Sequence, residues 1–367
     1  MTADPSTLAR PAIRQLRAYS SARSEIATSP LLLDANEAPG ERWEGTAADG
    51  LNRYPEPHPA ELVEQLAALY DVPRDWIMLG RGSDDGIDAL IRTFRESGRD
   101  SILVNEPTYG VYEVAARIHG AGIVRCQLHP EDFRLQPRDI ERRVDQDPVK
   151  LVFICSPNNP TGNRMATEDI VSVAQAVREK AVVVVDEAYV EFSDQPSLAR
   201  HIAAVPNLVV LRTLSKAWAL AGARCGSVIA APSVIALLHK VRAPYPLSTP
   251  AVDAVLYALR SGRAAGQPDA VQRLVRERQW LATQLQQRAY IRRVYPSDAN
   301  FLLLEVNGSA RSLYEHCLHH GIRVRDRSHL NGLGQCLRIT VGARRHSEML
   351  LHTMDSWPAA MPRGAHA

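Results

Sequence analysis

The pattern of hydrophobic and polar positions divides the chain into two parts. Between residues 100 and 231, five short apolar runs alternate with segments such as "TEDIVSVAQAVREK", in which apolar side chains recur every three to four positions. The runs are "SILVNEP", "KLVFICSP", "AVVVVDEAY", "NLVVLRT" and "GSVIAA". Strands that are apolar throughout and are separated by helices are typical of a mainly parallel sheet covered by helices on both faces. The pattern therefore predicts an α/β domain.

The pattern changes near residue 261. A long charged helix is predicted over "PDAVQRLVRERQWLATQLQQR", followed by a strand at "NFLLLEV", another helix, and a strand at "CLRITVG". This order predicts a second, smaller α+β domain that is reached through a linking helix. We expect an N-terminal arm over residues 1–44 that joins the small domain, a large domain over 45–262, and the linking helix and small domain over 263–367.

Composition excludes several classes of protein. The 367 residues are 45% hydrophobic and carry a formal charge of +2, without a basic stripe, so we expect no nucleic-acid surface. The longest run without charge, residues 225–238, is too short to cross a membrane.

Five scattered cysteines without a CxxC pair indicate reduced thiols in a cytoplasmic enzyme, without a zinc site. Arginines among serines near the N-terminus leave a transit peptide as the less favoured interpretation.

Three residues of chemical interest follow three predicted strands. Asn159 comes after "KLVFICSP", Asp186 ends "AVVVVD", and Lys216 comes after "NLVVLRTLS". In open α/β sheets, ligands bind outside the carboxyl ends of the strands. We therefore expect these three side chains to meet in one crevice.

Lys216 and Asp186 have residue types suited to one cofactor. A lysine becomes a nucleophile when its ammonium form is disfavoured, and small apolar neighbours with a nearby cation such as Arg224 have that effect. A carboxylate at the end of a buried run needs a cationic partner, and the protonated ring nitrogen of pyridoxal phosphate is one. Tyr189 and Asn159 could reach the oxygen of the same ring. The alternatives are a lysine at the surface and an aspartate that caps the next turn.

The loop "GRGSDDGIDALIRTF" follows the apolar run "WIML" and leads into a helix. Free N–H groups of Ser83 and Asp84 at the helix start would bind an anion such as a phosphate. The rival interpretation is a dinucleotide site, because the glycines nearly match GxGxxG, with the last one a position late. A dehydrogenase would leave Lys216 and Asp186 without a role.

Two arginines stand near the C-terminus. Arginine offers a planar fork that matches a carboxylate or a phosphate, and Arg338 lies inside the apolar pattern of "CLRITVG". Arg325 lies in "GIRVRD". A structural ion pair remains the alternative to a role in substrate binding.

Taken together, the motifs resemble the fold-type I pyridoxal-phosphate aminotransferases, and among them the histidinol-phosphate aminotransferases. The similarity covers nearly the whole chain and rests on "AYSSAR", "DANEAPG", "RYPEP", "GRGSDDGI", "NEPTYGVY", "SPNNPTG", "VDEAYVEFS", "TLSKAWALAGAR", "GIRVRD" and "LRITVG". The resemblance implies the fold-type I architecture, with pyridoxal 5'-phosphate bound in the large domain.

The resemblance also implies roles for individual residues. Lys216 would attach the cofactor, Asp186 would pair with the ring nitrogen, and Tyr189 and Asn159 would hold the ring oxygen. Tyr109 would stack on the ring. The cofactor phosphate would be bound by Ser83, Asp84, Thr213, Ser215 and Arg224. Tyr54 would reach the cofactor of a second subunit, which implies a homodimer. The substrate would be bound by Tyr19, Asn36, Arg325 and Arg338.

The implied reaction is transamination between L-histidinol phosphate and 2-oxoglutarate, giving imidazole-acetol phosphate and L-glutamate, in histidine biosynthesis. Three alternatives stay open. An aminotransferase for aromatic or other amino acids would share the cofactor residues, and a threonine-phosphate decarboxylase of the same fold would release carbon dioxide. A pyridoxal-phosphate-binding transcription regulator would carry a DNA-binding module upstream, of which we find no trace.

Overall fold

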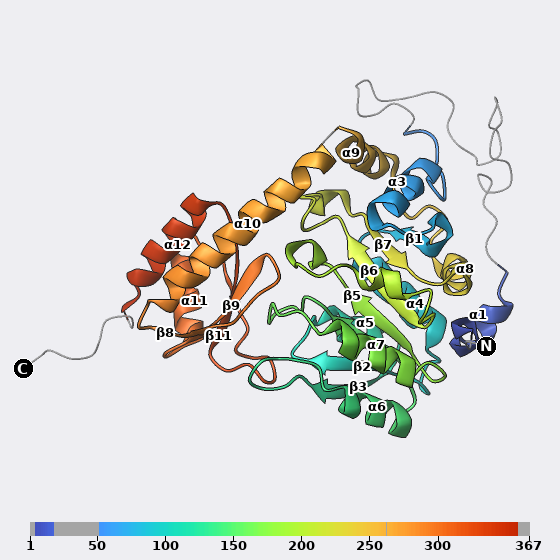
Figure 1. The fold of residues 1–367 in the computed structure, drawn as a ribbon, viewed down its shortest axis with the longest axis horizontal. Helices are drawn as coiled ribbons and strands as arrows, with labels where there is room; N and C mark the ends of the chain where they lie inside the picture. Colours follow the sequence, from blue (N-terminus) through green and yellow to red (C-terminus); the bar gives the residue numbers. More distant parts are fainter. Residues whose placement is uncertain (1–3, 18–50, 262, 359–367) are drawn as a thin grey trace, which may run out of the picture.

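The computed structural model describes residues 4–17, 51–261 and 263–358. Figure 1 shows a larger body and a smaller body joined by the long helix α10 (Arg263–Gln286). Within the described residues, seven strands form the sheet of the larger body, in the order β1-β7-β6-β5-β4-β2-β3. Their bounds are β1 (Ile77–Gly80), β2 (Ser101–Glu106), β3 (Gly122–Gln127), β4 (Val149–Cys155), β5 (Val182–Asp186), β6 (Leu208–Thr213) and β7 (Gly226–Ile229).

The apolar runs predicted as strands are strands β2, β4, β5, β6 and β7. Strands β3, β2, β4, β5 and β6 pair in parallel, whereas β7 pairs antiparallel with both β6 and β1. The expected mainly parallel sheet is confirmed. The antiparallel direction of β7 follows from its connection, because the chain returns from β6 through the short segment that carries Lys216 and Arg224.

Helices cover both faces of this sheet, which explains why its strands are apolar throughout. Side chains of β5 alternate, so that Val182 and Val184 face one buried cluster and Val183 and Val185 face the other. The first cluster is closed by α4 (Ser83–Phe94), α5 (Val111–Ile118) and α8 (Pro232–Val241). The second is closed by α3 (Ala60–Tyr70), α6 (Pro137–Gln146), α7 (Thr167–Ala176) and α9 (Thr249–Arg260).

The start of the expected N-terminal arm packs on the larger body. Its elements η1 (Pro5–Leu8) and α1 (Pro11–Gln15) contact α8 (Figure 1). Arg10 forms an ion pair with Glu96 at 3.2 Å, and Lys240 donates to the carbonyl of Arg14. Over residues 4–17 the arm therefore packs on α8 and on the segment that follows α4, and residues 18–44 of the expected arm lie outside the described residues.

The smaller body has a four-stranded antiparallel sheet in the order β10-β11-β9-β8, counted over the described residues. The strands are β8 (Ile291–Val294), β9 (Phe301–Val306), β10 (Arg325–Asp326) and β11 (Cys336–Thr340), and α10, α11 (Ala310–His319) and α12 (Arg344–Asp355) cover one face. On that face lie Leu337 and Ile339 of β11. Because strand side chains alternate, Arg338 points to the opposite face, toward the larger body.

Short 3-10 turns complete the structure: η2 (Arg74–Trp76), η3 (Val190–Phe192), η4 (Leu198–His201) and η5 (Ala221–Ala223). Among the helices that the structure describes, none is long and apolar enough to cross a membrane.

Candidate active site

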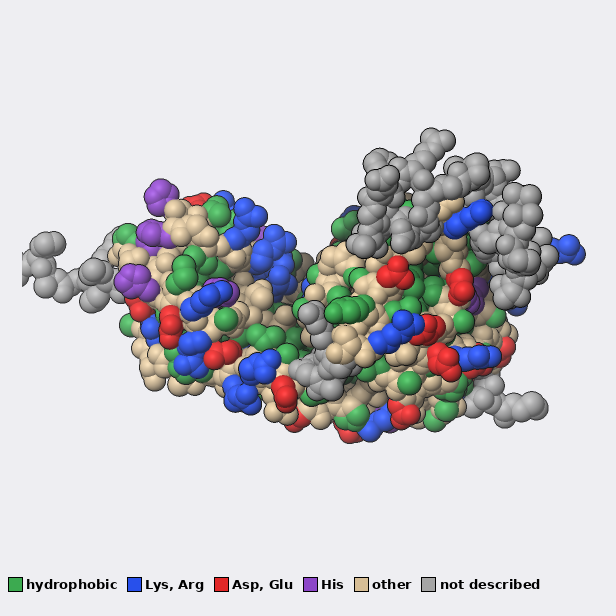
Figure 2. Space-filling model, turned by 90° about the horizontal axis from the view of Figure 1, so that it is seen from above, with side chains coloured by type: hydrophobic (Ala, Val, Ile, Leu, Met, Phe, Trp, Pro, Cys, Tyr) green, Lys and Arg blue, Asp and Glu red, His purple; other side chains and the backbone are tan. Residues whose placement is uncertain are grey.

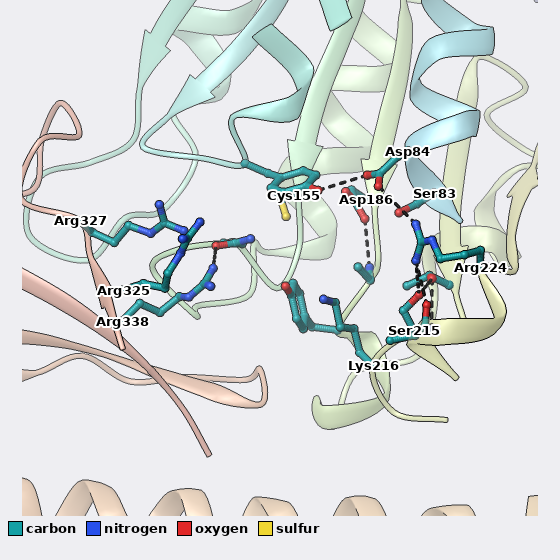
Figure 3. A pocket seen from close by; sticks show the side chains of 16 residues that line it. Ser83, Asp84, Cys155, Asp186, Ser215, Lys216, Arg224, Arg325, Arg327 and Arg338 are labelled. Atoms are coloured by element: carbon teal, nitrogen blue, oxygen red, sulfur yellow. Dashed lines mark hydrogen bonds and ion pairs between the residues drawn. The ribbon is translucent and has the colours of Figure 1, made fainter. Parts of the chain in front are cut away.

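A cavity of about 250 Å³ lies where the two bodies meet, at the carboxyl ends of the parallel strands. Figure 2 shows the hollow between the bodies from above, and Figure 3 shows the side chains that line the cavity. The expected convergence of three strand ends is what the structure shows, since Asn159, Asp186 and Lys216 all line it. Other predicted residues lining it are Ser83, Asp84, Tyr109, Tyr189, Thr213, Ser215, Arg224, Arg325 and Arg338.

Lys216 follows β6 and its amine points into the middle of the cavity (Figure 3). Burial lowers the pKa of this amine, and the positive charges of Arg338 and, to a smaller extent, Arg224 act in the same direction. From the sequence, we expect Arg224 to be the nearby cation. The larger contribution comes from Arg338 of the smaller body, because the folded chain brings β11 over the strand ends.

Asp186 ends β5 and is only 3% exposed. Its carboxylate accepts hydrogen bonds from the hydroxyl of Tyr112, at 2.7 Å, and from the backbone N–H of Ala188, at 3.1 Å. Burial raises the pKa of Asp186 to about 6, against the effect of these two neutral donors. A buried carboxylate with neutral donors is stabilised in its charged form when a cation is placed beside it.

One end of the cavity is built to hold an anion. Within the described residues, helix α4 begins at Ser83 without a side-chain cap, so its first N–H groups are available. Arg224 lies beside this helix start, with Nη2 3.6 Å from the carboxylate of Asp84 and Nη1 3.3 Å from Oγ of Ser215. The hydroxyl of Thr213 is 3.0 Å from that of Ser215.

Close packing of two glycines positions the start of α4. Gly82, just before the helix, has φ of 89°, a conformation that favours glycine. Gly226 in β7 lies so close to this loop that a Cβ there would be 2.5 Å from the carbonyl carbon of Gly82 and 2.7 Å from the nitrogen of Ser83. The backbone of β7 therefore supports the helix start directly.

Three polar side chains surround the middle of the cavity. The Tyr109 hydroxyl donates to Asp84 at 3.2 Å. Asn159 accepts a 2.5 Å hydrogen bond from Arg338 through its side-chain oxygen, which leaves its amide N–H groups for a ligand. The Tyr189 ring packs edge-on against Phe301 of the smaller body, and the Lys216 amine lies 5.7 Å from its centre.

The opposite end of the cavity holds three arginines. Arg325 and Arg338 were predicted there, and Arg327 was missed. The signal for Arg327 was its spacing of two from Arg325, which places both side chains on one face of an extended strand. Sequence reasoning also missed Cys155, which lines the cavity at the end of β4, and Tyr112 of α5, which does not line the cavity but donates a hydrogen bond to Asp186.

Tyr54 does not line this cavity. Its side chain is 50% exposed, and its ring stacks on Tyr245 with the centroids 4.5 Å apart. Its predicted role involves a second subunit and stays a prediction. Tyr19 and Asn36 lie outside the described residues.

These groups fit pyridoxal phosphate. An uncapped helix start with an arginine suits its phosphate, a buried carboxylate suits its protonated ring, and an amine of lowered pKa suits its aldehyde. The fold and the cavity together define a transferase of the fold-type I pyridoxal-phosphate class. The chain belongs to the aminotransferase class I and II family, whose sequence profile matches residues 28–356.

Curated relatives match almost the whole chain. The histidinol-phosphate aminotransferase of Stenotrophomonas maltophilia (strain R551-3) is 41% identical over 362 residues, covering 97% of this chain and 98% of the relative. The histidinol-phosphate aminotransferase of Serratia proteamaculans (strain 568) is 40% identical and covers 96% of each chain.

Solved structures share the fold. The histidinol-phosphate aminotransferase from Sinorhizobium meliloti, in complex with pyridoxal-5'-phosphate, has a TM-score of 0.76 at 24% identity and covers 84% of this chain and 82% of that chain. This similarity shows the same architecture, a mainly parallel sheet between helices together with a smaller α+β part.

Proposed function

We propose that this protein catalyses the transfer of an amino group between L-histidinol phosphate and 2-oxoglutarate, giving imidazole-acetol phosphate and L-glutamate, as a step in histidine biosynthesis. The observation that carries the proposal is that one cavity holds Lys216 and Asp186 between two separate groups of anion-binding residues. One group suits the phosphate of a cofactor, and the other suits the anionic group of a substrate. The curated relatives, at about 40% identity over nearly their full length, support the choice of substrate.

The residues that would hold pyridoxal phosphate come from the larger body. Ser83, Asp84, Thr213, Ser215 and Arg224 surround the place for its phosphate, while Tyr109, Asn159, Asp186, Tyr189 and Lys216 surround the place for its ring. When bound, the cofactor supplies an aldehyde that receives the amino group and a ring that accepts electrons. Asp186 would keep the ring nitrogen protonated, because a buried carboxylate favours a neighbouring cation.

Lys216 acts as the base and the acid. Its pKa is lowered by burial and by Arg338, so a larger fraction of the amine is neutral and can remove a proton from the substrate's α-carbon. The resulting ammonium would return that proton to the carbon atom of the cofactor's aldehyde group. Meanwhile Arg325 and Arg338 bind the far end of the substrate, which is a carboxylate in glutamate and a phosphate in histidinol phosphate. One flexible set of guanidinium groups can serve both anions in turn.

The remaining proposals concern assembly and organisation. The active form is a homodimer in which Tyr54 reaches the second subunit's site, since this side chain is half exposed and lies outside its own chain's cavity. The protein works in the cytoplasm, which five free buried cysteines support. The domain boundaries at 45–262 and 263–367 are supported by a buried cluster whose members, from Leu281 to Trp357, all belong to the smaller body.

The function is tested by adding L-histidinol phosphate to the purified, yellow holoenzyme without a keto acid. We expect rapid loss of the visible absorbance and release of imidazole-acetol phosphate. The Lys216→Ala variant serves as the control, because it keeps the cavity but lacks the amine, and it should show no turnover. An active Lys216→Ala variant would contradict the mechanism.

Other outcomes identify the rival functions. A response to glutamate or an aromatic amino acid, with none to histidinol phosphate, would keep the aminotransferase and exclude the proposed substrate. Release of carbon dioxide from O-phosphothreonine would indicate a decarboxylase of the same fold.

A further inference from the structure

Arg327 is the third arginine at the substrate end of the cavity. We propose that it is a specificity-determining residue, which makes this end select a dianionic phosphate over a singly charged carboxylate. The inference rests on the proposed function, because it concerns the same site and the class of substrate that the site takes.

The strand geometry brings the three arginines together. Arg325 lies directly opposite Arg338 in the register of β10 and β11. The backbone N–H of Arg327 donates to the carbonyl of Cys336 at 2.9 Å, so the pairing continues beyond β10. Residues two apart on a strand share a face, and Arg327 thus lies beside both others. Figure 3 shows their guanidinium groups side by side, at the end of the cavity away from Arg224.

The positive charge of this arginine cluster is not balanced by the carboxylate next to it. The carboxylate of Asp326 accepts hydrogen bonds from the N–H and the hydroxyl of Ser328, at 2.9 and 2.5 Å. The Nε atoms of Arg327 and Arg338 are buried and have no hydrogen-bond partner within the described part of the chain. Burial and the charges of Arg338 and Arg325 lower the pKa of Arg327 to about 10, while Tyr189 and Asp326 act weakly in the opposite direction.

A structural arginine in the same protein is arranged differently. Arg212 is buried between two carboxylates, 2.8 Å from that of Glu191 and 3.7 Å from that of Glu187. Its charge is therefore compensated by the protein itself, as is normal for a buried guanidinium. Arg327 forms no ion pair within the described part of the chain, and its half-buried charge, which Arg325 and Arg338 repel, is stabilised when an anion enters the cavity.

The number of guanidinium groups sets the preferred anion. A carboxylate has one charge and two oxygens, so a single bidentate arginine satisfies it. A phosphate monoester has three acceptor oxygens and nearly two charges above its second pKa of about 6. One guanidinium nitrogen of Arg338 already donates a hydrogen bond to the side-chain oxygen of Asn159. The third arginine thus supplies additional hydrogen-bond donors and positive charge. A phosphate dianion has enough oxygens and charge to use them, whereas a carboxylate does not.

The experiment compares wild type with Arg327→Gln and with Arg323→Gln as the matched control. Arg323 lies in the same segment, but it is exposed and does not line the cavity. In single half-reactions, we expect Arg327→Gln to lower kcat/KM for histidinol phosphate by about tenfold or more, and for glutamate by a clearly smaller factor. Arg323→Gln should leave the ratio of the two values unchanged. Equal losses for both substrates, or no loss, would overturn the proposal.

A second measurement does not depend on the identity of the substrate. Inorganic phosphate and acetate are tested as competitive inhibitors of the glutamate half-reaction of the holoenzyme, in which the cofactor occupies its own phosphate site. We expect Arg327→Gln to raise the inhibition constant of phosphate by a larger factor than that of acetate. If wild type does not react with histidinol phosphate, but Arg327→Gln raises the inhibition constant of phosphate more than that of acetate, the proposed substrate is wrong and the role of Arg327 stands. If the two constants change equally, the role of Arg327 is wrong.

Discussion

The hydroxyl of Tyr112 donates a 2.7 Å hydrogen bond to Oδ2 of Asp186, whose carboxylate lines the active-site cavity. Tyr112 is fully buried, and its ring stacks on Phe153 with the centroids 4.8 Å apart. Because the tyrosine cannot move away, the carboxylate is held in one orientation. The hydrogen bond also lowers the pKa of Asp186, which opposes the effect of burial.

Replacing Tyr112 with phenylalanine should therefore weaken catalysis while preserving the fold. Hydrogen bonds to charged groups contribute about 1.5–3 kcal/mol, so we expect kcat to fall about tenfold or more. The pKa of Asp186 should rise further, which makes a protonated cofactor ring less favourable. The measurements are kcat and the pH titration of the cofactor's visible absorbance.

A matched control is Tyr290→Phe, which removes a similar tyrosine–aspartate bond, 2.6 Å to Asp355, in the smaller body. Its kcat should stay near that of wild type. If both variants lose activity equally, Tyr112 has no special role at the active site.

The contact between Gly226 and the start of α4 predicts an effect on cofactor binding. In Gly226→Ala the new Cβ would meet backbone atoms of Gly82 and Ser83 at 2.5–2.7 Å, and neither can move aside without shifting the helix start. We expect the dissociation constant of pyridoxal phosphate to rise at least about tenfold, since the N–H groups that bind its phosphate are displaced. Gly334→Ala, where a Cβ meets nothing within 4 Å of the described structure, should bind the cofactor normally.

The buried charges around Arg212 predict a large effect on stability. Arg212 is 8% exposed, pairs with Glu187 and Glu191, and lies 4.6 Å from the centre of the Tyr70 ring. Arg212→Met leaves two carboxylates without their cation, so we expect a loss of about 3–5 kcal/mol in the free energy of unfolding. Denaturation by urea measures it. Arg311→Met, which breaks a surface pair with Glu315, should have a much smaller effect.

The pair of His58 and His239 predicts how stability depends on pH. Their Nε2 atoms are 2.8 Å apart, and burial, together with the charge of Arg242, lowers the pKa of His58 to about 4 and that of His239 to about 3. Both histidines stay neutral in the folded protein, whereas in the unfolded chain they bind protons below their ordinary pKa of about 6.5. Their contribution to stability is therefore present above pH 6.5 and is lost as the pH falls toward 4.

The measurement is the free energy of unfolding at pH 7 and pH 5.5, in wild type and in His239→Gln. Each histidine contributes a slope of up to about 1.4 kcal/mol per pH unit in this range. The variant should lose less stability between the two pH values than wild type does. An equal loss in both proteins would show that other groups control the acid sensitivity.

The sequence by itself determined five of the seven described strands in the larger body's sheet, all except β1 and β3, and the chemistry at their ends. A run such as "AVVVVD" is apolar on both faces, and only a strand between two helical layers buries all of it, as Val182–Asp186 does in β5. Asn159, Asp186 and Lys216 follow such runs, and their convergence follows from the parallel direction of the strands. These features depend on residues close together in the chain, so local patterns were enough.

The tertiary structure decided which groups act on one another. Arg338 dominates the surroundings of Lys216, Tyr112 holds Asp186, and Arg327 joins the substrate end only because β10 pairs with β11. The docking of residues 4–17 on α8 was decided in the same way. Such contacts depend on strand register and on the packing of one sheet against another, which are set by residues far apart in the chain. Periodicity along the sequence shows which face a side chain occupies, but not what that face meets.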